Sequence, residues 1–334
     1  MDIKRLEAWY NKHHRKLIFR ETKHPYDVWI SEIMLQQTQV DTVLPYFERF
    51  KKAYPTIHDL AIAKEDDLMK MVEGLGYYRR FRNMQLAAKV IVEKFGGEFP
   101  KTHEDVMSLP GIGAYTAGAI MSIAYNQPYS ALDGNVIRVL TRYLADNRDM
   151  RVERHKKDLD KINQSYIEKA HPYIYTQAMM ELGALICKPK NPKCEDCPLA
   201  EHCMAYQQDH VDKYPVLTKL KSPKHIQYKT LIIHDGEYIF LRKRDEDLLK
   251  GMYEYPQFEE ESIYSLEKMF EDMGIIIEID QLSETYQHVF SHQKWLMDVH
   301  HARYLSGDIS RWIKVHQSDL DKFPMAVAHR KIKI

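Results

Sequence analysis

Four cysteines gathered in one short segment constrain this chain more than any other feature of its sequence. They are Cys187, Cys194, Cys197 and Cys203, spaced C-x6-C-x2-C-x5-C, and the 334 residues contain no other cysteine. Because disulfides are rare in reducing compartments and the thiols share one segment, the spacing indicates a single metal site. Four thiolates can hold a tetrahedral zinc ion or a four-iron cluster. Zinc sites usually pair two C-x2-C knuckles, and only one is present, so iron–sulfur is favoured and zinc is the alternative.

Length and composition set broad limits on the rest. A chain of 334 residues predicts two domains, and 44% hydrophobic with 29% charged residues is typical of a soluble globular protein. No apolar run approaches the roughly 20 residues needed to cross a bilayer, and the N-terminus lacks a signal-peptide core, so we expect a cytoplasmic protein. The charges of the 48 basic and 48 acidic residues cancel, so the net charge is zero. Any affinity for nucleic acid must therefore come from local placement of charge.

The first two thirds of the chain have the apolar periodicity of helices, with Gly or Pro between many of them. The expected helices are 7–16, 28–36, 64–72, 80–94, 102–108, 115–125, 135–144, 156–170 and 173–186. One more is expected to run from a capping box of Thr38 and Asp41 to Tyr54.

The pattern changes after residue 210. Prolines and lysines predict a connector over 211–224, which separates a helical domain at 1–210 from a second domain at 225–334. In the second domain, 228–233 and 237–241 read as strands on either side of an Asp235-Gly236 hairpin turn. Residues 262–273 predict a helix, and the alternation around Trp295 predicts another strand, so this domain is expected to be α+β.

A glycine hairpin, Leu109-Pro110-Gly111-Ile112-Gly113, lies between two expected helices. Gly111 and Gly113 would let the backbone approach a phosphate closely, and the helix that starts near Ala114 would offer free N–H groups. The alternative is an ordinary connection between two helices.

Two carboxylates are candidates for chemistry. Glu32 lies among apolar residues, and burial would raise its pKa and keep it protonated; the alternative is a solvated residue on a polar face. Asp133 precedes an expected helix, where it would act as an N-cap and where a helix terminus favours its ionised form. A protonated acid facing an ionised partner is the arrangement that glycosidic cleavage requires.

The cysteine spacing resembles the iron–sulfur DNA glycosylases related to endonuclease III, and L-P-G-I-G resembles their helix-hairpin-helix. Longer segments resemble the adenine DNA glycosylases of the MutY family: 31–40 (SEIMLQQTQV), 74–78 (GLGYY), 132–136 (LDGNV) and 177–184 (QAMMELGA). The resemblance implies an all-α helix-hairpin-helix glycosylase domain with six-helix and iron–sulfur subdomains, the hairpin near 109–118, and one [4Fe-4S] cluster on the four cysteines. It implies a MutT-like (Nudix-fold) domain behind it.

The resemblance also implies an activity, removal of adenine paired with 8-oxoguanine or guanine in double-stranded DNA during base excision repair. Glu32 would protonate adenine N7, Asp133 would stabilise the sugar cation or its covalent adduct, and Tyr115 and Asn135 would support that site. The adenine would contact Arg20 and Glu181. Gln37 and Tyr77 would enter the base stack and help to flip the adenine out. The alternatives are a surface glutamine and a tyrosine that packs at a helix end.

Two positions depart from related enzymes. Lyase members of the superfamily carry a Schiff-base lysine two residues after the last hairpin glycine, where this chain has Tyr115. We therefore expect a monofunctional glycosylase, which leaves an abasic site. The family commonly has Pro-Trp before the adenine-binding arginine, and this chain has Ile18-Phe19.

In the second domain, Gly251–Pro256 matches the family's G-x-W/Y-x-F/Y-P stretch, and Phe290-Ser291-His292 matches its 8-oxoguanine loop. Ser291 and His292 are the implied recognition residues; the alternative for Ser291 is a strand end. The acidic Nudix helix motif is absent from 262–274, so no nucleotide hydrolysis is expected.

Two other functions stay open. One is a non-catalytic binder of damaged DNA, and the other is an endonuclease III-like glycosylase and lyase on oxidised pyrimidines. For all three we expect a monomer associated with the nucleoid and not with membranes.

Overall fold

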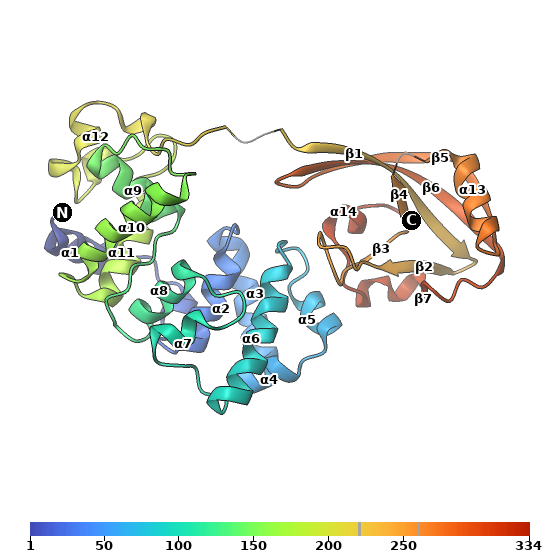
Figure 1. Ribbon diagram of the computed structural model, residues 1–334, viewed down its shortest axis with the longest axis horizontal. Coiled ribbons are helices and arrows are strands. Elements are labelled where there is room, and N and C mark those ends of the chain that lie inside the picture. Colours follow the sequence, from blue (N-terminus) through green and yellow to red (C-terminus); the bar gives the residue numbers. More distant parts are fainter. Residues whose placement is uncertain (220–221, 260) are drawn as a thin grey trace. The chain divides into compact units, whose positions relative to one another are not determined.

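The computed structural model describes residues 1–219, 222–259 and 261–334 (Figure 1). The chain divides into two compact units, one formed by residues 1–62 with 83–219 and the other by residues 63–82 with 220–334. The second unit therefore combines the C-terminal part of the chain with a short segment from its first third. Within the described residues, no helix has both the length and the apolar character that a membrane span requires.

The first unit is helical. Its helices are α1 (Ile3–His13), α2 (Pro25–Leu35), α3 (Val40–Ala53), α4 (Ile57–Ile62), most of α6 (Arg79–Phe95), α7 (His103–Met107), α8 (Ala114–Ile123), α9 (Gly134–Leu144), α10 (Glu153–Ile167), α11 (Pro172–Leu185) and α12 (Met204–Gln207). Short 3-10 turns are η1 (Ile18–Arg20), η2 (Cys194–Asp196), η3 (Ala200–His202) and η4 (Val211–Lys213).

Three helices form the interior of this unit. Most of α2, α8 and α11 is buried all round, as expected for helices that neighbours cover on every side. Helix α8 contacts both α2 and α11, and α11 also contacts α1 and α9. Gly118 lets the backbone at Ser130 lie directly against α8, because a Cβ at Gly118 would lie 1.8 Å from the Ser130 carbonyl oxygen. The functional side chains described below come from these helices and the turns that precede them.

Some expected details of this unit are wrong. The capping box of Thr38 and Asp41 does not form, because α3 begins at Val40 with Gln39 as N-cap, and the Thr38 hydroxyl donates to the carbonyl of Gln36 at 3.4 Å. Helix α1 begins at Ile3, four residues before the expected start at 7, because the Asp2 side chain accepts a hydrogen bond from the Arg5 N–H.

Helix α4 was not expected from the sequence. Its N-terminus has a reciprocal cap, in which the Asp59 carboxylate accepts from the Thr56 N–H at 3.0 Å and the Thr56 hydroxyl accepts from the Asp59 N–H at 3.2 Å. A T-x-x-D pattern before an apolar run is the signal that could have revealed it.

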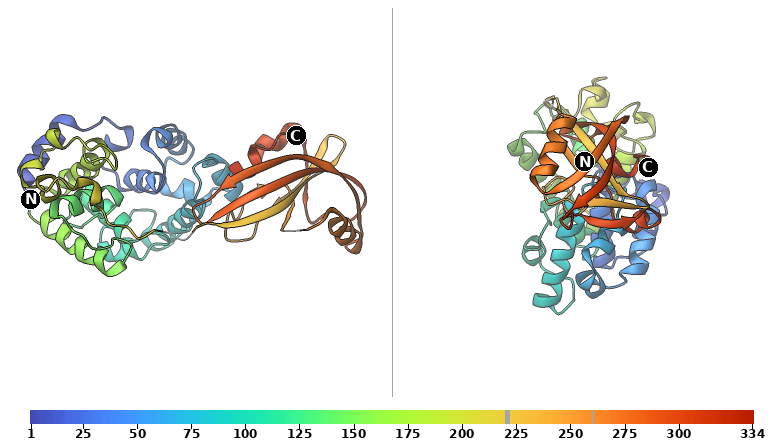
Figure 2. Two further views of the ribbon diagram at one scale, coloured as in Figure 1. Left: turned by 90° about the horizontal axis from the view of Figure 1, so that it is seen from above. Right: turned by 90° about the vertical axis from the view of Figure 1, so that its right-hand side faces the viewer.

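The second unit is built on a mixed sheet (Figures 1 and 2). Its strands are β1 (Lys224–Asp235), β2 (Tyr238–Lys243), β3 (Tyr253–Glu254), β4 (Gln257–Glu259), β5 (Ile275–Val289), β6 (Gln293–Gly307) and β7 (Ile313–His316). The order is β3-β2-β1-β6-β5, with β4 also paired to β1 and β7 to β2. Strands β1 and β6 are parallel from Lys224↔Gln293 to His234↔Arg303, and the β1–β2 hairpin turns after Asp235 as expected.

Successive residues of β1 point to opposite sides of the sheet, so the sheet has an apolar core on each face, and helical segments cover both. Leu231 and Ile233 belong to a core that includes Leu266 and Phe270 of α13 (Ile263–Asp272). Ile232 belongs to the opposite core, which is closed by residues of η5 (Gln317–Lys322) and by the segment around α14 (Val327–Arg330). Segment 63–82, with α5 (Glu65–Met71), completes this unit. The expected α+β class is confirmed.

Candidate active site and cysteine loop

The glycine hairpin lies between α7 and α8 as the sequence predicted. Gly111 has φ +76°, and a Cβ there would come within 2.6 Å of the Asn83 Cβ, so both conformation and packing require glycine. Gly113 is the N-cap of α8, and no side chain among the described residues caps that terminus. In the same part of the chain, no atom lies within 4 Å of a Cβ built at Gly113. The first N–H groups of α8 are therefore presented beside an open glycine, the arrangement expected of an anion-binding helix start.

Glu32 is buried in the middle of α2, with only 6% of its surface exposed. The alternative of a solvated polar face is therefore wrong. Burial is the largest influence and raises the pKa of Glu32, the nearby Asp133 charge also raises it, and a hydrogen bond from the Tyr115 hydroxyl and the charge of Arg20 oppose the rise; together they give a pKa of about 7. A carboxyl group in this state is protonated over much of the neutral range and can donate a proton.

Asp133 is the N-cap of α9, and its two oxygens have separate donors. One accepts from the Val136 N–H at 2.7 Å and the other from the Asn135 side chain at 2.8 Å. Burial raises the pKa of Asp133, and these hydrogen bonds and the charge of Arg138 oppose that rise. The structural role of a cap and the role of an oriented anion are therefore combined in one side chain.

The two carboxyl groups line one cavity of about 480 Å³ in the first unit. Four more residues predicted for the site or its lining also face this cavity: Phe19, Arg20, Tyr115 and Asn135. Phe19 is almost fully buried there and packs edge-on against Phe47. The structure thus brings together side chains that lie more than 100 residues apart in the chain.

Glu181 lies behind this cavity and is completely buried. Its carboxylate receives Arg15 Nε at 2.6 Å and Arg20 Nη1 at 2.6 Å. Burial by itself raises the pKa of Glu181, but the hydrogen bonds and charges of the two arginines outweigh it and lower the pKa to about 2. Arg15 was not predicted for the site, since nothing in the sequence links it to a residue 166 positions away.

A second residue that sequence reasoning missed is Arg138, on α9. Its guanidinium donates to the Asn135 side-chain oxygen at 2.9 Å and to the carbonyl of Cys187 at 2.7 Å. A continuous chain of hydrogen bonds therefore joins Asp133 to the backbone of the cysteine loop. The signal available in the sequence was the spacing Asp133, Asn135, Arg138 on a single helical turn.

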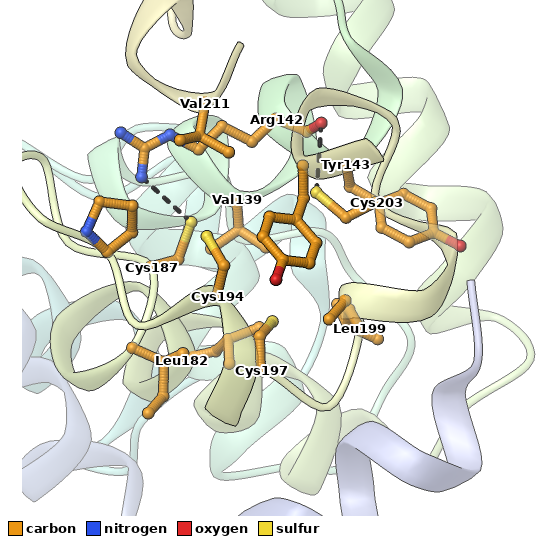
Figure 3. Close-up of a pocket in the computed structure, with 14 residues that line it drawn as sticks. Val139, Arg142, Tyr143, Leu182, Cys187, Cys194, Cys197, Leu199, Cys203 and Val211 are labelled. Atoms are coloured by element: carbon orange, nitrogen blue, oxygen red, sulfur yellow. Dashed lines mark hydrogen bonds between the residues drawn. The ribbon is translucent and has the colours of Figure 1, made fainter. Parts of the chain in front are cut away.

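The four cysteines line one pocket (Figure 3). Cys187 follows α11, Cys194 and Cys197 flank η2, and Cys203 precedes α12, so the turns of the loop direct all four toward the same space. Arg142 donates to the Cys187 sulfur at 3.4 Å and to the carbonyl of Lys188 at 2.7 Å. Among the residues described, no set of three or more His, Cys, Asp and Glu side chains is close enough to hold a metal ion. The four thiols therefore face one space, as a shared iron–sulfur group requires.

A second cavity, of about 440 Å³, lies in the second unit. Tyr77, Ser291 and His292 all line it. Tyr77 has φ +49° and is 48% exposed, and Ser291 and His292 are exposed at the β5–β6 turn. Gln37 lies in the first unit in the turn between α2 and α3, is exposed, has φ +58°, and does not line the cavity of Glu32.

Sequence comparisons agree with both units. The profile of the HhH-GPD superfamily base excision DNA repair proteins matches residues 30–164, the iron-sulfur binding domain of endonuclease III matches 187–203, and the NUDIX domain matches 229–333. The adenine DNA glycosylase of Buchnera aphidicola subsp. Baizongia pistaciae is 41% identical over 260 residues, which cover 75% of this chain and 72% of that protein. This chain belongs to the adenine DNA glycosylase family.

Other relatives of the adenine DNA glycosylase family extend this likeness. The adenine DNA glycosylase of Homo sapiens is 41% identical over 212 residues, 61% of this chain and 39% of that protein. Two solved structures share the helical fold at 25% identity, each aligned over 62% of this chain. They are a thermostable thymine-DNA glycosylase (TM-score 0.57, 95% of that chain) and a non-covalent endonuclease III–DNA complex (TM-score 0.53, 94% of that chain).

Membership of the adenine DNA glycosylase family confirms several predictions. The chain is a DNA glycosylase with a helix-hairpin-helix domain, an iron–sulfur loop and a Nudix-fold domain, as the motifs indicated.

Proposed function

We propose that this chain is a monofunctional glycosylase that removes adenine paired with 8-oxoguanine or guanine from double-stranded DNA in base excision repair. One observation carries the proposal: Glu32, buried with a pKa of about 7, faces the same cavity as the capped carboxylate of Asp133. A proton donor and an anion on one cavity are the two groups that cleavage of a glycosidic bond needs.

In the proposed reaction, Glu32 donates its proton to adenine N7. The electron pair of the C1′–N9 bond then moves onto the purine, and the sugar is left as an oxocarbenium ion. Asp133 stabilises that cation or bonds to C1′, since the capping hydrogen bonds fix its orientation. The Glu32 carboxylate then takes a proton from the water that attacks C1′, and where Asp133 is bonded to C1′ that C–O bond breaks and returns its electron pair to the Asp133 carboxylate. An abasic site is left.

Other cavity residues would hold the reacting groups in place. Tyr115 donates to Glu32 and Asn135 to Asp133, so each carboxyl group has its own orienting partner. Arg20 faces the cavity and would contact the extruded adenine, whereas Glu181, which is buried and does not line the cavity, would act on the base through Arg20. Phe19 would lie against the base with its ring alone, because it lacks the indole donor.

The glycine hairpin would hold the DNA backbone, and two exposed side chains would enter the base stack. The backbone at Gly111 and Gly113 would bind a phosphate near the start of α8. Gln37 and Tyr77, both in positive-φ turns and both exposed, would enter the base stack as the adenine leaves it.

Recognition of the opposite base is assigned to Ser291 and His292. The supporting observation is that both line one cavity with Tyr77, within the same unit. The Ser291 hydroxyl can act as donor or acceptor, and it lies 3.3 Å from His292 Nδ1. It could therefore hydrogen-bond the N7/O8 edge that distinguishes 8-oxoguanine from guanine.

The proposed cofactor is one [4Fe-4S] cluster on Cys187, Cys194, Cys197 and Cys203. When bound, its iron–thiolate bonds would tie the end of α11, through Cys187, to the start of α12, through Cys203. Replacement of Cys197 by Ala should lower iron content and visible absorbance of the purified protein. A colourless wild-type protein that contains zinc would show that the cluster assignment is wrong.

The decisive experiment incubates purified protein with a duplex containing adenine opposite 8-oxoguanine, and then treats it with alkali. Alkali-dependent strand breaks at the adenine are expected, with parallel duplexes carrying A:G, A:C and A:T to define selectivity. Protein that binds the duplex but leaves the strand intact would favour a non-catalytic binder. Strand scission without alkali, through an imine trapped by borohydride, would favour the endonuclease III-like lyase, against the evidence of Tyr115.

We further propose that the protein acts as a monomer, is associated with the nucleoid in the cytoplasm, and hydrolyses no free nucleotides. Its functional domains are proposed to be 1–210 and 225–334, with a connector at 211–224. Light scattering of the free protein and of its duplex complex tests the first point.

A further inference from the structure

We infer that Arg330 is a positioning residue for the loop Gly74–Tyr78, and that discrimination of the base opposite adenine depends on its ion pair with Glu73. The inference rests on the proposed function, in which Tyr77 enters the base stack and Ser291 faces the opposite base. Arg330 itself touches no reacting group; it acts through the loop that carries Tyr77.

The contact is bidentate. Arg330 Nε lies 2.7 Å from Glu73 Oε1, and Arg330 Nη2 lies 3.3 Å from Glu73 Oε2. The same guanidinium donates to the carbonyl oxygens of Leu320 at 3.2 Å and Phe323 at 2.7 Å. Its Nη1 also pairs with the exposed Asp321 carboxylate at 3.1 Å. Because these groups of the C-terminal segment hold its remaining donors, the planar fork has one fixed orientation toward Glu73.

The loop begins directly after this contact, since Glu73 precedes Gly74 in the chain. Gly74, Gly76 and Tyr77 have φ values of +97°, +68° and +49°, a sequence of left-handed conformations that is unfavourable for tyrosine. A loop of this kind keeps one conformation only if its ends are fixed by their surroundings. At the first end of the loop, the ion pair with Arg330 fixes Glu73 to the C-terminal segment, and the Gly74 N–H donates to the Tyr78 hydroxyl at 3.1 Å within the loop.

A separate contact holds the helix before the loop. Asp66 of α5 binds Lys243 Nζ at 2.5 Å and receives the Tyr253 hydroxyl at 2.9 Å. With this anchor in place, loss of the Arg330 contact should free the loop without releasing the whole of segment 63–82. Glu73 also keeps Lys70 as a partner at 2.6 Å, so its charge would not be left uncompensated.

The conformation of the loop affects the distance between Tyr77 and Ser291. Tyr77 and Ser291 line the same cavity, and the fixed loop sets their separation. A shift of Tyr77 would change how the opposite base is held against Ser291, whereas Glu32 and Asp133 belong to the other unit. The structure therefore assigns to Arg330 an effect on opposite-base selectivity and none on the chemical step.

The experiment compares single-turnover adenine removal from A:8-oxoguanine and A:G duplexes by wild type, Arg330→Ala and Glu73→Gln. We expect both variants to lower the ratio of the two apparent second-order rate constants, roughly tenfold as for loss of one coupled contact, with the rate at saturating enzyme on A:8-oxoguanine unchanged. Arg303→Ala is the matched control, because it removes an exposed ion pair with Glu278 elsewhere in the same unit and should leave the ratio unchanged. Glu73→Gln weakens the same ion pair but leaves the contacts of Arg330 within the C-terminal segment intact, so the test can still be made if Arg330→Ala fails to fold.

If Arg330 acts through Tyr77, its effect on the ratio should depend on the Tyr77 side chain. In a Tyr77→Ala background, Arg330→Ala should change the ratio by less than twofold, since the side chain that it positions is gone. An unchanged ratio in folded Arg330→Ala, or an equal effect in both backgrounds, would overturn the inference. Failure of wild type to remove adenine at all would instead contradict the proposed function, so the two failures are distinguishable.

Discussion

The Tyr115 hydroxyl donates a hydrogen bond to the carboxyl group of Glu32, across 83 residues of sequence. Burial raises the pKa of Glu32, and this hydrogen bond opposes the rise more strongly than the charge of Arg20 does, so that the pKa is about 7. The pair joins α2 to the first turn of α8, directly after the glycine hairpin. Two residues after the last hairpin glycine, this chain thus has a tyrosine whose hydroxyl lowers the pKa of Glu32.

Replacement of Tyr115 by Phe should shift the alkaline limb of the pH–rate profile to higher pH. The hydrogen bond stabilises the ionised form of Glu32, so its loss raises the pKa and keeps the acid protonated at higher pH. Single-turnover adenine removal from pH 6 to pH 9 measures the shift. Tyr125→Phe is the matched control, because that hydroxyl donates to the Phe99 carbonyl outside the site. A limb that stays in place or moves to lower pH would contradict the prediction.

Replacement of Glu32 by Gln should abolish most base removal, by roughly 100-fold to 10,000-fold, the usual contribution of a general acid. The same change should stabilise the protein at alkaline pH. The folded pKa of about 7 lies above the unfolded value of 4.5, so wild type loses stability as pH rises from 4.5 to 7. The accumulated loss is roughly 3 kcal/mol, at 1.36 kcal/mol for each pKa unit.

Thermal unfolding of wild type and Glu32→Gln at pH 5 and pH 8 measures this effect. The variant should exceed wild type at pH 8 by more than it does at pH 5. An identical pH dependence in the two proteins would mean that Glu32 is not a strained buried acid.

Replacement of Asp133 by Asn should separate capping from catalysis. Asparagine caps helices about as well as aspartate, so α9 should remain formed and stability should change by less than about 1 kcal/mol. Removal of the negative charge should slow base removal on the order of 100-fold or more. Fluorescence anisotropy with the A:8-oxoguanine duplex should show retained binding. An active Asp133→Asn variant would assign the residue to the cap alone.

Local features of the site could be predicted from the sequence because their signals are local. Asp133 directly precedes a helix, and the four cysteines lie within one loop, so spacing alone identified them. Glu32 was identified by its apolar neighbours, which correctly indicated burial. The division into a helical part and an α+β part followed from a change in apolar period after residue 210, which requires no knowledge of long-range contacts, whereas the helix-hairpin-helix and Nudix folds followed from the resemblance to known families.

Partners distant in the sequence could not be predicted in the same way. Arg15 pairs with Glu181 and Glu73 with Arg330, over 166 and 257 residues respectively. Charged residues are common on helix surfaces, so no pattern marks these four among the others. The Thr38 cap failed for a related reason, because the positive-φ turn at Gln37 gave its hydroxyl a different partner from the one that spacing suggested.

Replacement of Arg15 by Ala should reduce stability at neutral pH by about 2 to 3 kcal/mol, because it weakens the compensation of a fully buried charge. The pKa of Glu181 is lowered to about 2 in the folded protein against 4.5 when unfolded, so its ion pairs stabilise the fold above pH 4.5 and this stability is lost as pH falls toward 2. Denaturant unfolding at pH 7 and pH 3 should therefore show a smaller difference in Arg15→Ala than in wild type. Arg5→Ala is the control, since Arg5 and Glu201 are both more than half exposed and their pair should contribute less than about 1 kcal/mol. Equal losses in the two variants would mean that burial of Glu181 does not determine the strength of its ion pairs.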